Sequence, residues 1–172
     1  RSFSGLNAKQ IDAISPKWLK TITRQQWRQI PASSMSGLKR QDIKSLPDQT
    51  LRSITTNQAA ALKPQALLGL QKHQIDLLPL KVIAVFSAKQ ARKIKPNLIG
   101  ELSGQQLSKL QPSALAKFSP RQFRNIAAQA ISKLTPQQIS ELPTKLMRSM
   151  SGNQARQLNK QVLQSLAPRQ IK

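Results

Sequence analysis

The sequence predicts an all-α solenoid, in which each eight-residue repeat (octad) forms one short helix and two helices form a sixteen-residue coil. Three observations predict this fold: an unbroken apolar octad, prolines confined to two octad positions, and an alternation of Gln every sixteen residues. With Asn7 as position one, all 22 residues at position five and all 21 at position eight are apolar. Only 38% of the chain is hydrophobic, so chance does not produce this register.

The spacing of the apolar positions excludes other regular structures. Apolar residues follow one another at alternating intervals of three and five, and odd intervals place neighbours on opposite faces of a strand. In one continuous helix, eight residues at about 100° each leave a drift of about 80° per octad, so no apolar stripe forms. All eleven prolines lie at positions one and two. Because Pro interrupts a helix interior but suits its first turn, a new helix begins in each octad.

Many octads carry the residues that start a helix. Ser119-Pro120 places a hydroxyl at the N-cap and Pro at the first helical position. Gln122 follows three residues after this cap, which predicts a capping box. The apolar residue at position eight precedes the next cap and is expected to pack on position five as a hydrophobic staple.

Position four defines the sixteen-residue unit. It is Gln in every second octad, with Asp42 as the exception, and it is apolar or small in the octads between. We expect the two helices of each coil to stack at roughly 8–10 Å and to depend on neighbouring coils. The Gln amides are interpreted as a structural ladder that closes capping boxes or bonds the next Gln, with recognition of nucleic-acid bases as the alternative. The ladder comprises Gln58, Gln74, Gln90, Gln106, Gln122, Gln138 and Gln154.

The charge predicts an acidic partner. The chain has 28 Lys and Arg against six Asp and Glu, a formal charge of +22, which favours nucleic acid, acidic polysaccharide or an anionic membrane surface. Seventeen basic residues lie at positions three and six, one helical turn apart on the outer ridge. Ten of these lie on Gln-type helices: Lys9, Arg28, Lys44, Lys89, Arg92, Arg121, Arg124, Arg156, Arg169 and Lys172. The predicted polyanion-binding ridge is Lys89, Arg92, Arg121, Arg124 and Arg156.

The sequence offers no catalytic, metal or cofactor site, and we expect the protein not to be an enzyme. The single His73 occupies an outward position near Asp76, and no nucleophile and base accompany it. The six carboxylates are scattered and Cys is absent, which argues against metal clusters. Trp18 and Trp27 lie at core positions, so packing is favoured over stacking on a ligand.

The octads resemble two groups of repeat proteins. Ser-Pro-x-Gln octads such as Ser119-Pro120-Arg121-Gln122 are similar to those of the extracellular superhelical mesothelin, stereocilin and otoancorin family. The run Thr55-Thr56-Asn57-Gln58-Ala59-Ala60-Ala61-Leu62 resembles the octads of large bacterial surface and adhesion repeat proteins. The resemblance covers essentially the whole chain and implies an extracellular or cell-surface role in attachment or spacing.

Together these features predict a non-enzymatic, basic structural or adhesive scaffold that binds acidic polymers outside the cell or at its surface. An intracellular nucleic-acid-binding solenoid and an end-to-end self-assembling module are the alternatives. Residues 1–172 read as one continuous repeat array, expected to be part of a longer repeat protein. Since no apolar run approaches the length of a bilayer span, no transmembrane segment is expected.

Overall fold

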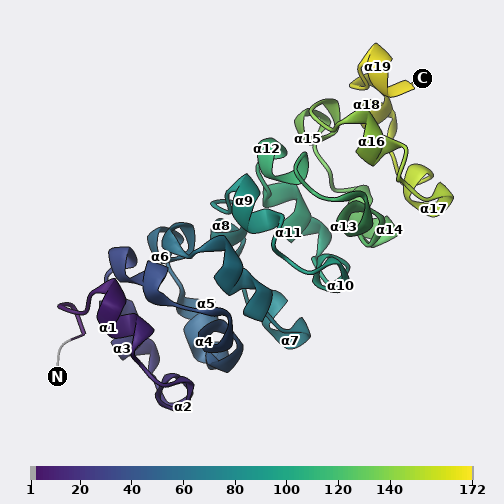
Figure 1. Ribbon diagram of the computed structural model, residues 1–172. Coiled ribbons are helices and arrows are strands. Elements are labelled where there is room, and N and C mark those ends of the chain that lie inside the picture. Colours follow the sequence, from purple (N-terminus) through teal and green to yellow (C-terminus); the bar gives the residue numbers. More distant parts are fainter. Residues whose placement is uncertain (1–2, 172) are drawn as a thin grey trace. The chain divides into compact units, whose positions relative to one another are not determined.

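The computed structural model describes residues 3–171, except for the side chains of Arg169 and Ile171. Within these residues every regular element is a short helix and no strand occurs, so the predicted all-α solenoid with one helix per octad is confirmed (Figure 1). The chain divides into two compact units, Arg1–Phe86 (unit 1) and Ser87–Lys172 (unit 2). None of the described helices is both long enough and apolar enough to span a bilayer.

Unit 1 contains ten described helices, eight α-helices and two 3-10 helices. They are α1 (Ala8–Asp12), α2 (Pro16–Leu19), α3 (Arg24–Gln29), η1 (Ala32–Gly37), α4 (Arg40–Ser45), α5 (Asp48–Ser53), α6 (Thr56–Ala61), η2 (Pro64–Gly69), α7 (Lys72–Ile75) and α8 (Leu80–Ile83).

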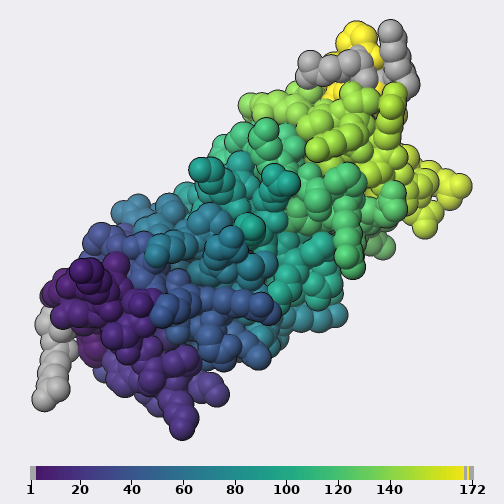
Figure 2. Space-filling view, viewed as in Figure 1, coloured from purple at the N-terminus to yellow at the C-terminus, as the bar shows by residue number. Residues whose placement is uncertain are grey.

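Unit 2 contains eleven described α-helices of the same kind. They are α9 (Ala88–Ala91), α10 (Pro96–Ile99), α11 (Gly104–Lys109), α12 (Pro112–Leu115), α13 (Pro120–Arg124), α14 (Ala128–Ile131), α15 (Pro136–Ser140), α16 (Thr144–Met147), α17 (Gly152–Ala155), α18 (Lys160–Gln164) and α19 (Pro168–Ile171). In the space-filling view the colours of unit 2 follow one another in sequence order, because each turn lies on the turn before it (Figure 2).

Helices begin where the sequence predicts. At α13, the Ser119 side chain accepts a hydrogen bond from the Gln122 N–H (3.1 Å), while the Ser119 N–H donates to Gln122 Oε1 (2.9 Å). Pro120 occupies the first turn, where its missing N–H costs nothing. The same reciprocal box starts α3, α6, α9, α11, α15 and α17. Each box holds the start of its own helix, which is too short to be stable in isolation.

The turn of the solenoid is longer than the expected sixteen residues. In unit 1, α1 packs on η1, α2 on α4 and η1 on α6; in unit 2, α9 packs on α12 and α13 on α16. Each of these pairs is three octads apart. Long-range hydrogen bonds join residues 28 and 31 positions apart, so the chain returns over itself after between three and four octads. The expectation of two helices per coil is therefore corrected.

The backbone torsions explain the longer turn. The residues between successive helices are extended, for example Ile30 (φ −68°, ψ 124°) and Ser119 (φ −74°, ψ 156°). An extended corner redirects the chain without reversing it, so several octads are needed for one turn. Because three is an odd number, each of the helix pairs named above joins a Gln-type helix (or α4, with Asp42) to a helix of the other type. The Gln type recurs in the stack four octads later.

Positions five and eight form the core, as predicted. Ile11 and Leu107 at position five and Ile22 and Phe118 at position eight are typical, with at most 1% of their surface exposed. Exposure rises near the ends of the described chain, where Leu163 is 50% exposed. Trp27 is fully buried as expected, whereas Trp18 is only half-buried, with its ring centroid 5.5 Å from that of Phe3.

Two glycines in unit 1 allow the closest approach between turns. A Cβ on Gly37 would collide with the carbonyl oxygen of Ala8, and a Cβ on Gly69 would collide with that of Arg40. Both residues end 3-10 helices that pack on the α-helix three octads earlier. Gly152 is the contrasting case, because nothing lies within 4 Å of the Cβ position.

Replacing Gly69→Ala is expected to lower the free energy of unfolding by about 1–3 kcal/mol, because the added methyl group overpacks backbone against backbone. The matched control Gly152→Ala should be neutral or stabilise by up to about 1 kcal/mol, since Ala favours a helix over Gly. Denaturant melts of both variants measure the difference. Equal effects at the two positions would contradict the close approach at Gly69.

Candidate functional site

The glutamine ladder lies inside the fold. All seven ladder residues named above are at most 4% exposed. Gln122 shows the pattern: Oε1 accepts from the Ser119 N–H, and Nε2 donates to the carbonyls of Ala91 (3.1 Å), Arg92 (3.3 Å) and Ile94 (2.7 Å). One buried amide thus closes its own helix start and holds the end of α9, four octads earlier.

The same offset recurs along the chain. Gln58 and Gln74 in unit 1 donate to carbonyls 31 and 28 residues earlier, as do Gln138, Gln154 and Gln170 in unit 2. The acceptors are backbone carbonyls. The alternative that the sequence allowed, a bond from each Gln to the next Gln, is not what these amides make. Buried amides with these partners are not presented to nucleic-acid bases.

Asp42 occupies a ladder position in unit 1 but lacks the amide N–H donor of a Gln side chain. Its Oδ2 accepts from the Lys39 N–H (2.7 Å), which retains half of the Gln pattern. A carboxylate has no proton to donate to the carbonyls of Ile11 and Ile14, the acceptors that the offset assigns. Burial raises the pKa of Asp42 from its ordinary value of 3.8, and the Lys39 N–H and the positive charge of Lys39 oppose this rise.

The five residues of the basic ridge lie on three helices of one ladder. Lys89 belongs to α9 and Arg92 is its C-cap, Arg121 and Arg124 belong to α13, and Arg156 is the C-cap of α17. All five side chains are exposed. Gln122 joins α13 to α9 and Gln154 joins α17 to α13, so the ladder stacks the ridge residues on successive turns of unit 2.

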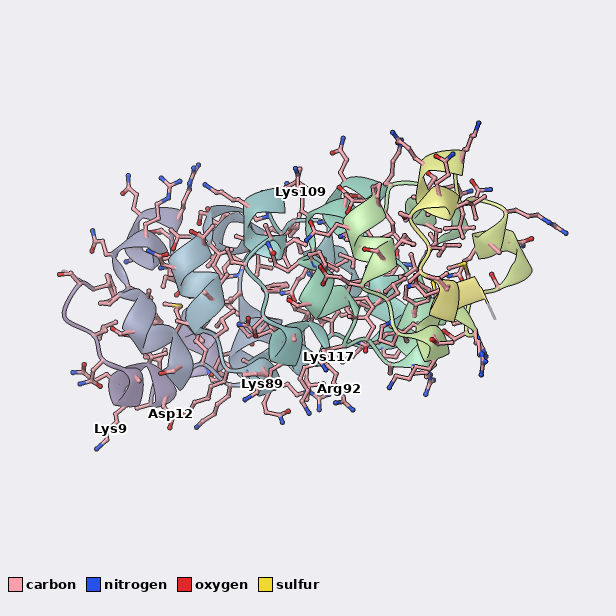
Figure 3. All side chains as sticks on the ribbon, turned by 90° about the horizontal axis from the view of Figure 1, so that it is seen from above. Lys9, Asp12, Lys89, Arg92, Lys109 and Lys117 are labelled. Atoms are coloured by element: carbon pink, nitrogen blue, oxygen red, sulfur yellow. The ribbon has the colours of Figure 1, made fainter. Side chains whose placement is uncertain are left out.

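Little negative charge offsets this ridge. Unit 2 contains fifteen Lys and Arg but only Glu101 and Glu141 as acids. Lys89 and Arg92 project from one edge of unit 2, and Lys109 projects from the opposite edge (Figure 3). Two further ridge candidates from the sequence, Lys172 and the side chain of Arg169, lie outside the described residues. That the ridge binds a polyanion stays a prediction.

A basic groove lies beside the ridge in unit 2. The groove has a volume of about 370 Å³ and is lined by Arg92, residues 116–120 from the connection between α12 and α13 and the start of α13, Pro143 and Lys145. These residues come from three successive turns, since α9 packs on α12 and α13 packs on α16. Arg92, Lys117 and Lys145 are all exposed, and none of the lining residues is acidic. Lys117 and Arg92 project from the same edge (Figure 3).

The sequence did not predict this groove. Lys117 lies at position seven, outside the ridge positions, and the sixteen-residue coil placed Arg92, Lys117 and Lys145 on unrelated turns. Residues spaced by 25 and 28 positions lie on adjacent turns only because one turn of the solenoid takes between three and four octads.

Unit 1 has an equivalent hollow with different charges. Two adjoining spaces of about 270 and 330 Å³ are lined by Asp12, residues 36–40 and Lys63, among others. Asp12 lies eighty positions before Arg92, and Gly37 lies eighty positions before Lys117. Lys39 Nζ lies 2.8 Å from Asp12 Oδ1, and this hydrogen bond and charge raise the pKa of Lys39. The hollow of unit 1 therefore contains a carboxylate that already pairs with a cation.

The single histidine lies near an aspartate of another octad. His73 Nε2 lies 3.9 Å from Asp48 Oδ1, and both side chains are exposed, 63% and 61%. Over residues 3–171 no group of three or more His, Cys, Asp or Glu side chains is placed to hold a metal ion.

Replacing Gln122→Ala is expected to lower the free energy of unfolding by about 2–4 kcal/mol, because the part-buried Ser119 N–H and the carbonyls of Ala91 and Ile94 lose their partner. Gln105→Ala, at an exposed position, is the control and should change it by less than about 0.5 kcal/mol. Gln122→Glu keeps the acceptor and removes the donor, so it should remain destabilising. Thermal and denaturant melts test this, and a silent Gln122→Glu would show that the Nε2 bonds contribute nothing.

Asp42 is expected to make stability depend on pH. Its folded-state pKa is raised, so its stabilising contribution is fully present below the ordinary value of 3.8 and is lost as pH rises through the folded pKa. The wild type should therefore lose stability relative to Asp42→Asn over that interval. Melts of both proteins across the acidic range measure the difference, and parallel curves would contradict the raised pKa.

Neither a protein-family model nor a curated protein matches this chain. The octad resemblance stays an expectation, and a function must be inferred from the positions and chemistry of the chain's own residues.

Proposed function

We propose that this chain is a non-catalytic repeat scaffold that binds an acidic polysaccharide, outside the cell or at its surface, through the basic edge of unit 2. The observation that supports the proposal most is the ridge of Lys89, Arg92, Arg121, Arg124 and Arg156. Its cations are exposed, and the buried ladder aligns them on successive turns. A regular row of cations suits a polymer with repeated negative charges, because each turn adds one more contact.

The ridge is ordered from inside the protein. Gln122 Nε2 bonds the carbonyl of Arg92, and Gln154 Nε2 bonds that of Arg124, both at 3.3 Å. The Arg124 Nε–H donates to the Ser149 carbonyl at 3.3 Å. These bonds fix the backbone positions of the cations before a ligand arrives, which reduces the entropy that binding costs.

Two features favour an acidic polysaccharide over nucleic acid. The ladder amides are buried, and Phe118 and Phe123, the two aromatic residues of unit 2, are at most 1% exposed. Proteins that bind single strands usually stack bases on exposed aromatic rings, and unit 2 has none to offer. A flexible chain of charged sugars requires cations rather than stacking surfaces.

The triple variant Arg121→Gln, Arg124→Gln and Arg156→Gln is expected to weaken binding of a sulfated polysaccharide about tenfold or more at physiological salt, since each exposed contact contributes up to about 1 kcal/mol. Its affinity should also fall less steeply with salt, because fewer counterions are exchanged. Calorimetric titration from 50 to 300 mM salt measures both quantities.

The matched control replaces Lys109, Lys133 and Lys160 by Gln, which removes the same charge outside ridge and groove. Equal losses in the two triple variants would show that net charge acts without the ridge. Tighter binding of duplex DNA or single-stranded RNA than of the polysaccharide would contradict the proposed partner.

A further inference from the structure

We infer that the basic groove of unit 2 is a subsite for one sulfated sugar unit of the acidic polysaccharide, held by Arg92, Lys117 and Lys145. This inference rests on the proposed function and adds a defined binding position to it. Arg92 belongs to both ridge and groove, so a polymer lying along the ridge passes the groove entrance.

The groove gathers cations that are far apart in the sequence. Arg92 comes from the end of α9, Lys117 from the connection between α12 and α13, and Lys145 from the first turn of α16. No lining residue is acidic, so all the charged side chains that an entering anion meets are positive. An oxyanion with several acceptor oxygens can be contacted by all three cations, and charge-assisted bonds of this kind are the strong ones.

The walls of the groove are held in place independently of any ligand. Pro120 and Pro143 fix their backbone φ angles. Ser119 is held in the capping box of Gln122, and the same Gln122 amide bonds the Arg92 carbonyl. The groove is therefore preformed, and binding orders only the three flexible side chains.

The size and lining indicate a sugar unit. A volume of about 370 Å³ lies at the small end of the range for ligand sites in proteins, and it exceeds the needs of a bare inorganic anion. The apolar lining consists of Ala116, Pro120, Pro143 and the buried Phe118. A nucleobase would find no exposed ring for stacking, whereas a sulfated sugar needs mainly the cations.

The equivalent hollow of unit 1 provides an internal comparison for the groove of unit 2. There Asp12 stands in place of Arg92, Gly37 in place of Lys117 and Gln65 in place of Lys145. Lys39, the nearest cation of that hollow to Asp12, already pairs with the carboxylate at 2.8 Å. Lys9, Arg40 and Lys63 also line this hollow, so the difference from unit 2 is the Asp12 carboxylate, which repels an entering anion and already pairs with Lys39. We therefore expect weaker binding in unit 1 than in unit 2.

Amide NMR spectra of the full chain, titrated with a sulfated uronic-acid disaccharide, test the inference. We expect saturable shifts at residues 117–119 and Lys145 and clearly smaller shifts at residues 37–40. The desulfated disaccharide retains its carboxylate and should bind more weakly, which separates the ester sulfate from the carboxylate as the recognised group. Shifts spread evenly over both units, or a dinucleotide that binds more tightly than the disaccharide, would overturn the inference.

Two matched variants complete the test. Lys117→Gln is expected to weaken disaccharide binding about three- to fivefold, as loss of one exposed charged contact implies. Lys109→Gln removes the same charge from the same octad position on the opposite edge and should change affinity less than twofold. Equal effects would overturn the inference.

Failure of this inference is distinguishable from failure of the proposed function. The ridge variant at Arg121, Arg124 and Arg156 leaves Arg92, Lys117 and Lys145 intact. Polymer binding that depends on the ridge without disaccharide binding in the groove would refute the subsite alone, whereas absence of polymer binding would refute the proposed function.

Discussion

Five of the seven ladder amides, those of Gln58, Gln74, Gln122, Gln138 and Gln154, connect two parts of one unit that lie four octads apart. Gln154 accepts from the Ser151 N–H at the start of α17 (2.9 Å) and donates to the carbonyls of Phe123 and Ile126 at the end of α13. Helix starts leave N–H groups and helix ends leave carbonyls without partners, and every octad creates both. A residue with an acceptor and a donor on one short side chain can satisfy the two together, and Gln is the amide long enough to reach back to the cap.

The recurrence of ladder bonds every four octads also determines which surface residues lie on adjacent turns. Because the Gln-type helices recur in the stack every four octads, position six of one Gln-type helix lies one turn away from position six of the next. Arg92, Arg124 and Arg156 are separated by 32 residues each and follow this rule. Substitutions at exposed positions leave the ladder untouched, so the same frame carries a cationic groove in unit 2 and an ion-paired hollow with Asp12 and Lys39 in unit 1.

The local features of the fold were predictable from sequence because they depend on neighbours within one octad. The cap at Ser119, the Pro at residue 120 and the apolar positions five and eight each have a local physical cause. The size of the turn was not predictable in this way, since it depends on the angle at extended corners such as Ile30. The Gln alternation suggested a sixteen-residue coil, but it reflects the pairing of unlike helices across an odd number of octads.

The candidate site was predictable in part for the same reason. The ridge follows from octad positions and needs only the repeat, so Lys89 and Arg121 could be identified from sequence. The groove depends on which turns are adjacent, so Lys117 could not. The burial of Trp18 could not be predicted from its octad position either. It occupies a core position, yet it is only half-buried and packs beside the ring of Phe3.

The neutral Gln amides in the core also explain how a chain with a formal charge of +22 remains folded. Cross-turn contacts made by ion pairs would need carboxylates, and these would neutralise the surface. Neutral amides make the same connections and leave the described lysine and arginine side chains exposed or half-exposed. Asp42 is the instructive exception, because a carboxylate in the ladder accepts at the cap but donates nothing to the earlier helix. Burial raises the pKa of this carboxyl group, whereas a neutral Gln amide such as that of Gln154 supplies both the acceptor and the donor.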